Sequence, residues 1–570
     1  MLPPPLERLP ARLQKLVLLG TWRGRGAPRL TALFVLTAIA CWGEPGARGA
    51  ASPALPPSAA FPDAEDAAEP GPVLAPAAPP TPLPPDSADA HDLAVPPSSV
   101  ARPGQAPGRV VEQALPKLDA LSAWVKTHKG DLSFALRDLG SGRELMADGA
   151  GRALNPASNE KLITAAVVLS ELGPQFRFHV GVLGKLADGV APRLVIRGNG
   201  DPTFSYEELR GFGERLVALG LKRVTGDVLV DQSAFDDKYT PPAFEQQPGE
   251  WAAFRAPVSA VSLDRNSTTL HVFPTKPGQL ARVEFEPPGY VSVQGEVRTE
   301  KGKKRDHVGL TLKPNGLLLG AQVSGDIPDG DQVVHLTRRI DNPEIYAGVV
   351  LKRVLTTLGV DVQGEAKRGG EDESVELVGR DSAKLSELVP QLGKASDNFY
   401  AETLFKTLGS VKRGKPGTAE SAALVVLDWL KSRQLADDGL KITNGSGLYD
   451  ANRVSARTLT RLLEAAYLDP TISRAYQDQL AVGGLDGTLR ARFYALRNRR
   501  SVHAKTGTLN KVTALSGYVF GPDQETGVAF SILVSGTSAH AEIRQRMDAL
   551  VLEISDALWA PKNLAAIARR

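Results

Sequence analysis

Three short strings contain the residues of this chain that are equipped to carry out a reaction. They occur in the order Ser158-Asn159-Glu160-Lys161, Ser396-Asp397-Asn398 and Lys505-Thr506-Gly507. A serine hydroxyl is a weak nucleophile until a neighbouring base removes its proton, and a lysine can be that base where no histidine is used. The three strings together therefore predict acyl transfer through a serine.

Ser158 is predicted to begin a helix. Asn155 and Pro156 precede it, and apolar residues at helical spacing follow it. The helix dipole then favours negative charge that develops at Ser158, and Lys161, three positions later, lies on the same face. A free lysine titrates near ~10.4 and is a poor base at neutral pH. We therefore expect burial and a second cation, Lys505, to lower the pKa of Lys161.

The second string also precedes apolar residues at helical spacing, which predicts another helix entrance. The hydroxyl of Ser396 can pass a proton to a leaving amine, and the amide of Asn398 can hold the backbone of a substrate. This string is therefore the expected partner of the nucleophile.

The third string lies in a predicted strand, and two further strand patterns follow at 512–520 and 527–534. Thr506 and Thr508 lie on one side of this strand, and Gly507 lets the backbone of a ligand approach closely. The backbone N–H groups of the strand, together with that of Ser158, predict an oxyanion hole for the charge of a tetrahedral intermediate.

These strings resemble those of the D-alanyl-D-alanine carboxypeptidase/endopeptidases, the low-molecular-mass class C penicillin-binding proteins of peptidase family S13. The resemblance covers roughly residues 115–559. Secondary strings that match the family are Gly200-Asp201-Pro202-Thr203, Asp231-Gln232-Ser233-Ala234-Phe235, Asn444-Gly445-Ser446-Gly447-Leu448 and Asp486-Gly487-Thr488-Leu489.

The resemblance implies a serine-type D-Ala-D-Ala carboxypeptidase or D,D-endopeptidase that acts on peptidoglycan stem peptides and cross-links and is inhibited by β-lactams. It implies that Ser158 is the nucleophile and Lys161 its base. The backbone N–H groups of Ser158 and Thr508 are then expected to hold the oxyanion. Lys505 and Thr506 are expected to bind the terminal carboxylate of the substrate or of penicillin.

The interval between Lys161 and Ser396 is too long for a connection within one domain. The resemblance implies an α/β (α+β) fold, in which the antiparallel sheet and flanking helices of a serine β-lactamase/transpeptidase-like domain are interrupted by nested β-rich inserted domains. Glu250, in the insertion, is the candidate for recognising a diaminopimelate side chain. The predicted organisation is a catalytic domain at 111–185 and 385–565, inserted domain II at 186–257 and 341–384, and inserted domain III at 258–340.

The N-terminus predicts export to the periplasm or the cell envelope. Three arginines precede an apolar run from Leu30 to Trp42, and small residues follow. This run is too short for an ordinary membrane span, so residues 1–50 are expected to be a signal peptide or a lipoprotein signal. Cys41, the only cysteine, is either a lipid-attachment site that anchors the protein to a membrane or a small apolar residue. Residues 51–110 contain 16 of the 43 prolines and predict an extended, unfolded spacer.

Composition excludes several other classes of function. The net charge is only +3, from 67 Lys and Arg against 64 Asp and Glu, and the chain has no arginine-rich aromatic patch, which argues against nucleic acid as a partner. None of the eight histidines has the spacing of a metal ligand, and no cofactor motif is present. We therefore expect neither a metal nor a cofactor.

Other interpretations of the same residues stay open. Ser158 could be a helix N-cap, and Lys505 could protect an exposed strand edge. At the level of function, a β-lactamase or esterase on the same fold would use the same serine but would turn over penicillin quickly. A catalytically vestigial wall-binding protein would form no covalent adduct with penicillin at all.

Overall fold

The computed structural model describes residues 106–302, 305–330, 332–370, 375–524 and 526–560. The predicted leader with Cys41 and the predicted spacer as far as residue 105 lie outside the described residues. Helix α1 (Ala106–Thr127) begins inside the predicted spacer, a few residues before the predicted start of the catalytic domain at residue 111. Pro107, the second residue of this helix, is tolerated there because its missing N–H would have no partner within the helix. No helix of the described part is long and apolar enough to cross a membrane.

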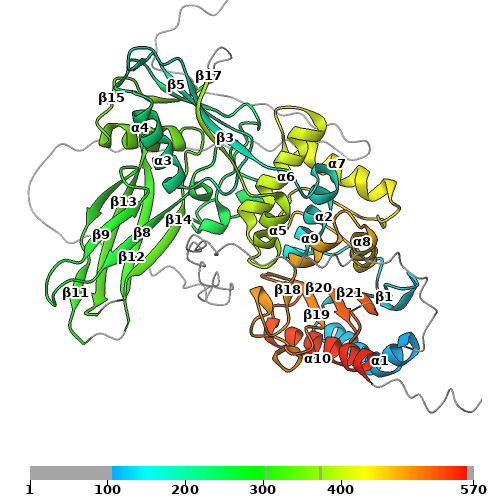
Figure 1. Cartoon of the computed structure of the whole chain (residues 1–570). Helices are drawn as coiled ribbons and strands as arrows, with labels where there is room; N and C mark the ends of the chain where they lie inside the picture. The colour runs from blue at the N-terminus through cyan, green and yellow to red at the C-terminus, as the bar shows by residue number, and fades with distance from the viewer. Residues whose placement is uncertain (1–105, 303–304, 331, 371–374, 525, 561–570) are drawn as a thin grey trace, which may run out of the picture. The chain divides into compact units, whose positions relative to one another are not determined.

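The central element is an antiparallel sheet of six strands in the order β18-β19-β20-β21-β1-β2 (Figure 1). Its strands are β1 (Asp131–Asp138), β2 (Glu144–Asp148), β18 (Ala481–Val482), β19 (Val502–Leu509), β20 (Val512–Phe520) and β21 (Gly527–Ser535). The pairing of β1 with β21 joins strands from near the two ends of the described chain in one sheet. Strand β20 is buried at every position, which explains its nearly continuous apolar sequence.

Helices pack on both faces of this sheet (Figure 1). One face packs against α1 and α10 (His540–Trp559), and Leu515 and Ile532 point into that core. The other face packs against a group of helices, and Tyr518 and Leu533 point into the second core. This group consists of α2 (Glu160–Leu172), α5 (Leu385–Gly393), α6 (Asn398–Arg413), α7 (Ala419–Ser432), α8 (Ala456–Leu468) and α9 (Ser473–Asp478).

The segment between α2 and α5 has four smaller sheets and a hydrophobic core of its own. The first part contains β3 (His179–Gly184), β4 (Val190–Ala191), β5 (Leu194–Gly198), α3 (Tyr206–Ala218), β6 (Arg223–Val224) and β7 (Val228–Asp231). The middle part contains β8 (Ser267–Phe273), β9 (Arg282–Glu286), β10 (Val291–Gly295), β11 (Arg298–Glu300), β12 (His307–Asn315), β13 (Leu318–Pro328) and β14 (Val334–Arg339). The last part contains α4 (Tyr346–Thr357), β15 (Asp361–Val362), β16 (Ala366–Arg368) and β17 (Val375–Asp381).

Strand β3 differs from the predicted boundary of the insertion. Residues up to 185 are predicted to belong to the catalytic domain, but β3 begins at His179 and pairs with β5 and β17 of the insertion. Its sheet mixes parallel and antiparallel pairs in the order β16-β7-β5-β3-β17, and α3 and α4 belong to the same core. The division into two nested domains stays a prediction.

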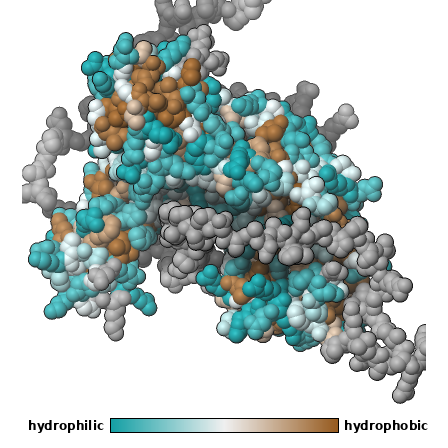
Figure 2. Space-filling model, viewed as in Figure 1, coloured by the Kyte–Doolittle hydropathy of each residue, from teal (hydrophilic) through white to brown (hydrophobic). Residues whose placement is uncertain are grey.

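Apolar surface is unevenly spread over the face shown in Figure 2. A brown patch gathers in the region where Figure 1 labels β15 and α4, while much of the remaining coloured surface is hydrophilic. The large apolar side chains that are exposed include Leu219, just after α3, and Leu358, just after α4.

Candidate active site

A 3₁₀ turn presents Ser158 at the entrance of α2. The turn spans Ala157–Asn159, so the α-helix proper begins at Glu160, after the predicted start at Ser158. Ala157 has a φ of 46°, in the left-handed region, and its N–H donates to the side chain of Asn155 at 2.9 Å. Strained backbone of this kind persists where the surroundings fix it, and it is common at functional sites.

Lys161 connects three parts of the site through hydrogen bonds. Its Nζ donates to Ser158 Oγ at 3.1 Å, to Asn398 Oδ1 at 2.7 Å and to the carbonyl of Ser446 at 2.9 Å. An ammonium has three donors, and these three acceptors use all of them. The side chain is fully buried, and burial lowers the pKa of Lys161 to about 8. A lysine with this pKa can act as a general base near neutral pH.

The cause of this lowered pKa differs from the expected one. Burial is the main cause, and the nearby charges on Glu402, Asp397 and Glu160 oppose it by raising the pKa of Lys161. The expected repulsion between the two lysines is seen instead at Lys505, where burial and then the charge of Lys161 lower the pKa well below its ordinary value.

Lys505 and Ser396 form a second lysine–serine pair. Lys505 Nζ donates to Ser396 Oγ at 2.7 Å and to the carbonyl of Thr506 at 2.9 Å. Ser396 has a φ of 57°, so it too is held in the left-handed region. Asn398 is the first residue of α6, and its Oδ1 accepts from Lys161. The structure therefore brings together all five residues predicted as catalytic.

Strand β19 leaves an open edge beside these pairs. Strand β20 pairs with β19 along its whole length, whereas β18 pairs only with His503 and Ala504. Among the described strands, none pairs with the outer edge from Lys505 onward. Thr508 is exposed, and Thr506 Oγ1 donates to Thr488 Oγ1 at 2.9 Å. Such an edge can take up an extended peptide as an additional strand.

The structure requires glycine at position 507 for a reason that the sequence does not indicate. A Cβ at this position would lie 3.0 Å from the carbonyl oxygen of Pro156 and 3.1 Å from the Cβ of Ala157. Glycine therefore lets β19 approach the turn that carries the nucleophile, rather than only leaving room for a ligand. Asn159 strengthens the same junction, because its amide group lies 2.7 Å from Ser516 Oγ on β20.

Two buried carboxyl groups near Lys161, those of Glu402 and Glu160, have no role in the chemistry predicted from the sequence. Glu402, one turn after Asn398 on α6, accepts from the backbone N–H groups of Gly445 at 3.2 Å and Ser446 at 2.8 Å. Burial raises the pKa of Glu402. Burial and the neighbouring charge of Glu402 also raise the pKa of Glu160 well above its ordinary value. Glu402 has a signal in the sequence, because it lies four positions after Asn398 on a predicted helix and therefore on the same face.

Glu250 lies in a loop that borders the site. Its carboxylate accepts from the backbone N–H of Ala252 at 2.8 Å, and its carbonyl accepts from Arg255 and Arg339. Farther along the loop, the carbonyl of Phe254 accepts from Asn398 Nδ2 at 3.1 Å. The loop therefore contacts the site, while the role of the Glu250 carboxylate stays a prediction.

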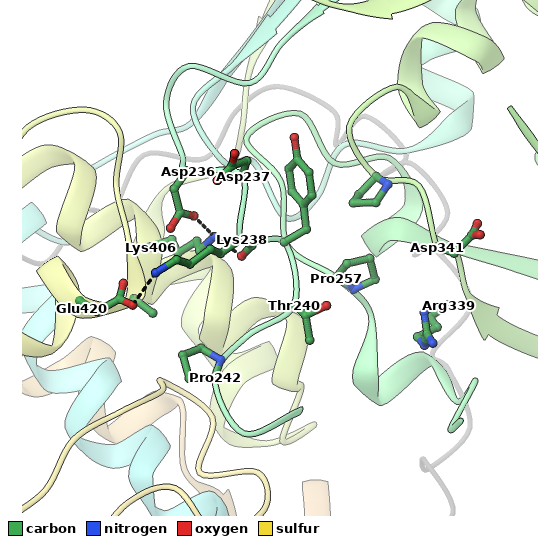
Figure 3. Close-up of a pocket in the computed structure, with 13 residues that line it drawn as sticks. Asp236, Asp237, Lys238, Thr240, Pro242, Pro257, Arg339, Asp341, Lys406 and Glu420 are labelled. Atoms are coloured by element: carbon green, nitrogen blue, oxygen red, sulfur yellow. Dashed lines mark hydrogen bonds and ion pairs between the residues drawn. The ribbon is translucent and has the colours of Figure 1, made fainter. Parts of the chain in front are cut away.

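A separate cavity has a volume of about 440 Å³ (Figure 3). It is lined by residues of the insertion and by Lys406, Ala419 and Glu420 of the helical group, and by none of the five predicted catalytic residues. Its lysines are paired, Lys406 with Asp236 and Lys238 with Glu420. This cavity therefore does not involve the residues predicted to be catalytic. The described residues also contain no group of side chains that could hold a metal ion.

The site and the sheet together define a class of protein. A penicillin-binding serine acyltransferase has three such elements: a serine that is hydrogen-bonded to a buried lysine, a second lysine–serine pair and an open strand edge. The chain belongs to the D-Ala-D-Ala carboxypeptidase 3 (S13) family, which matches residues 117–554. This match confirms the predicted family and the predicted kind of enzyme.

Known relatives agree with this assignment. The chain is 32% identical over 444 residues to a D-alanyl-D-alanine carboxypeptidase of Actinomadura sp. (strain R39), covering 74% of this chain and 80% of that relative. It is 25% identical over 398 residues to D-alanyl-D-alanine carboxypeptidase DacB of Haemophilus influenzae, covering 67% of this chain and 80% of that relative. The crystal structure of penicillin binding protein 4 (dacB) from Haemophilus influenzae superposes with a TM-score of 0.65 at 21% identity, over 76% of this chain and 99% of that one. This similarity confirms the predicted fold class.

Proposed function

We propose that the chain hydrolyses D-Ala-D-Ala termini and D,D-cross-links of peptidoglycan peptides through an acyl-enzyme at Ser158. The observation that carries this proposal is the contact of 3.1 Å between Lys161 Nζ and Ser158 Oγ. The low pKa of Lys161, caused by its burial, supports the role of the neutral amine as the base.

Acylation is proposed to follow from this geometry. Ser158 Oγ attacks the carbonyl carbon of the scissile bond while Lys161 takes its proton. Negative charge that develops on the carbonyl oxygen is held by the backbone N–H groups of Ser158 and Thr508. The C–N bond then breaks, and the leaving amine receives a proton through Ser396, which accepts a hydrogen bond from Lys505. The product is an ester between Ser158 and the acyl part of the peptide.

Deacylation uses the same groups on a water molecule. Water attacks the ester carbonyl, Lys161 accepts its proton, and Ser158 leaves as the restored hydroxyl. A β-lactam acylates Ser158 by the same step, but its leaving amine stays tethered to the acyl group, so the adduct is expected to last. Inhibition by β-lactams is therefore part of the proposal.

Substrate binding is proposed along the open edge of β19. Lys505 and Thr506 bind the terminal carboxylate, Gly507 and Thr508 face the peptide backbone, and Asn398 positions the acyl part. Glu250, on the bordering loop, is the proposed partner of the diaminopimelate side chain. A cross-link presents the same carbonyl with a larger leaving amine, so endopeptidase activity requires only an open end of the site.

The cellular setting is proposed from the N-terminal sequence. The basic and apolar leader supports export to the periplasm or envelope, where peptidoglycan is the substrate. Cys41 is the candidate for a lipid anchor, and the spacer after it supports reach away from a membrane.

The function is tested on the purified protein and its Ser158→Ala variant, with a labelled penicillin and a cross-linked muropeptide as substrates. The proposal expects three results from the first protein only: a lasting penicillin adduct, cleavage of the cross-linked muropeptide into monomers, and release of D-alanine from D-Ala-D-Ala termini. Rapid turnover of the penicillin without peptide hydrolysis would support a β-lactamase instead. Absence of any adduct from a folded protein would support a wall-binding protein without catalytic activity.

A further inference from the structure

The insertion contacts the Ser396–Asn398 string at two points. Arg265, just before β8, forms an ion pair with Asp397 in which an Nη atom lies 3.0 Å from Oδ2. The carbonyl of Phe254, also in the insertion, accepts from Asn398 Nδ2 at 3.1 Å. Since Asp397 lies between Ser396 and Asn398, both contacts act on the string that meets the two lysines of the site.

The turn that carries Arg265 is built to hold it in place. Asp264, Arg265 and Asn266 have φ values of 46°, 56° and 49°, so three successive residues are left-handed. Residues other than glycine adopt this backbone region only where the surroundings compensate for the strain. The buried amide of Asn266 provides that support by donating to the carbonyl of Pro257 at 2.9 Å and to Ser259 Oγ at 2.9 Å.

Asp397 connects this turn to helix α6. One of its carboxylate oxygens caps the helix by accepting from the backbone N–H of Tyr400 at 3.1 Å, and the other meets Arg265. The guanidinium of Arg265 also lies over the ring of Tyr400, 5.2 Å from its centre. Arg265 therefore holds both the cap and the first turn of α6, from which Asn398 reaches Lys161.

We propose that Arg265 is a positioning residue for the reaction, because it fixes Asp397 and thereby Ser396 and Asn398. The inserted part is then required for catalysis itself and not only for substrate fit. This inference rests on the proposed function, in which these residues act during acylation.

Charge gives the proposal a readout that a purely structural contact would not have. Lys161 faces the carboxyl groups of Glu160, Glu402 and Asp397, as well as the amine of Lys505. Arg265 offsets the charge of Asp397. Loss of the guanidinium leaves that charge unbalanced and raises the pKa of Lys161, so acylation requires a higher pH.

The test measures the second-order rate of acylation by a fluorescent penicillin between pH 6 and pH 9.5 in the full-length protein. Arg265→Met is expected to lower the rate at pH 7 by about 10- to 100-fold, because small displacements of catalytic groups have effects of this size. The rising limb of its pH profile is expected to move to higher pH. Asp397→Asn keeps the helix cap but removes the charge, so its limb is expected to move to lower pH. The double variant should behave as Asp397→Asn does.

The matched control is Arg223→Met, which breaks an exposed ion pair with Asp361 elsewhere in the insertion. Its rate and pH profile are expected to equal those of the wild type. Arg265→Lys is expected to restore the position of the pH limb but only part of the rate, since lysine keeps the charge and loses the planar fork. An unchanged pH profile in Arg265→Met, or a loss of rate that only follows a loss of thermal stability, would overturn the proposal. The proposed function itself would survive that result, because wild-type acylation at Ser158 is measured separately.

Discussion

Glu402 accepts a hydrogen bond from the backbone N–H of Ser446 at 2.8 Å, while the carbonyl of that same Ser446 accepts from Lys161 Nζ at 2.9 Å. One buried carboxyl group on α6 therefore fixes the loop that orients the proposed base. A second carboxylate contact, with the N–H of Gly445, holds the preceding residue of the loop.

Replacement of Glu402 by glutamine tests this link. In the wild type, each carboxylate oxygen of Glu402 accepts from one backbone N–H, of Gly445 or Ser446. Glutamine has only one acceptor oxygen, so its NH₂ group would face the other N–H, two donors would meet, and the loop should shift. We expect acylation by penicillin to slow about 10- to 100-fold. Leaving a buried donor unsatisfied should also lower the free energy of unfolding by about 1–3 kcal/mol. Glu542→Gln, at an exposed position on α10, is the control and should leave the rate of acylation unchanged. Normal acylation by Glu402→Gln would show that the loop does not depend on this carboxyl group.

The pH dependence of acylation follows from the pKa of Lys161. Burial lowers this pKa from 10.5 to about 8, and only the neutral amine can take the proton of Ser158. The rate should therefore rise about tenfold per pH unit below pH 7 and level off above about pH 8, as the neutral fraction saturates. Stopped-flow acylation between pH 6 and pH 10.5 measures this limb. A limb near the ordinary pKa of lysine would mean that the amine is not shifted by its surroundings.

The close approach of β19 to the nucleophile turn predicts a strong effect of a single methyl group. Gly507→Ala would place a Cβ 3.0 Å from the carbonyl oxygen of Pro156, and the turn would have to move. We expect a loss of about 1–3 kcal/mol in the free energy of unfolding and acylation at least about tenfold slower. Gly211→Ala is the matched control, because a Cβ there meets nothing within 4 Å in helix α3. That change should stabilise the protein by about 0.5–1 kcal/mol. Equal behaviour of the two variants would refute the packing argument.

The proposed role of Glu250 is tested by a variant that keeps its loop intact. Gln at this position retains an oxygen that can accept from the N–H of Ala252 and loses only the charge. We expect kcat/KM for a diaminopimelate-containing peptide to fall about two- to fivefold, the size of an exposed ion pair. Acylation by penicillin, which lacks that side chain, should stay at the wild-type rate. A parallel loss with both compounds would assign Glu250 to the loop and not to the substrate.

Local patterns in the sequence predict much of the framework. The strands expected at 512–520 and 527–534 match β20 and β21 closely, because both segments are largely apolar. The five catalytic candidates can likewise be identified from the sequence, because each lies in one of three short recognisable strings. The structure brings these strings together. Strand β3 lies before the predicted boundary at residue 185 but pairs with β5 and β17 beyond it, and such long-range pairing gives no local signal in the sequence.

Long-range contacts account for what the sequence does not reveal. Arg265 and Asp397 are far apart in the chain, and nothing local indicates that a guanidinium from the insertion reaches the second string. The sequence likewise does not reveal that burial, and not the charge of Lys505, lowers the pKa of Lys161, because complete burial of a lysine is a tertiary property. The carboxyl group of Glu160 is buried for the same reason and gives no local signal.

The central claim is that Ser158 becomes acylated with Lys161 as its base. Peptide mapping by mass spectrometry after incubation with benzylpenicillin tests it most directly, in the wild type and in Ser158→Ala and Lys161→Met. The account predicts one adduct, on the peptide that contains Ser158, no adduct in Ser158→Ala and at least about a 100-fold slower appearance in Lys161→Met. An adduct on Ser396 or elsewhere in the folded wild type, or undiminished acylation of Lys161→Met, would contradict it.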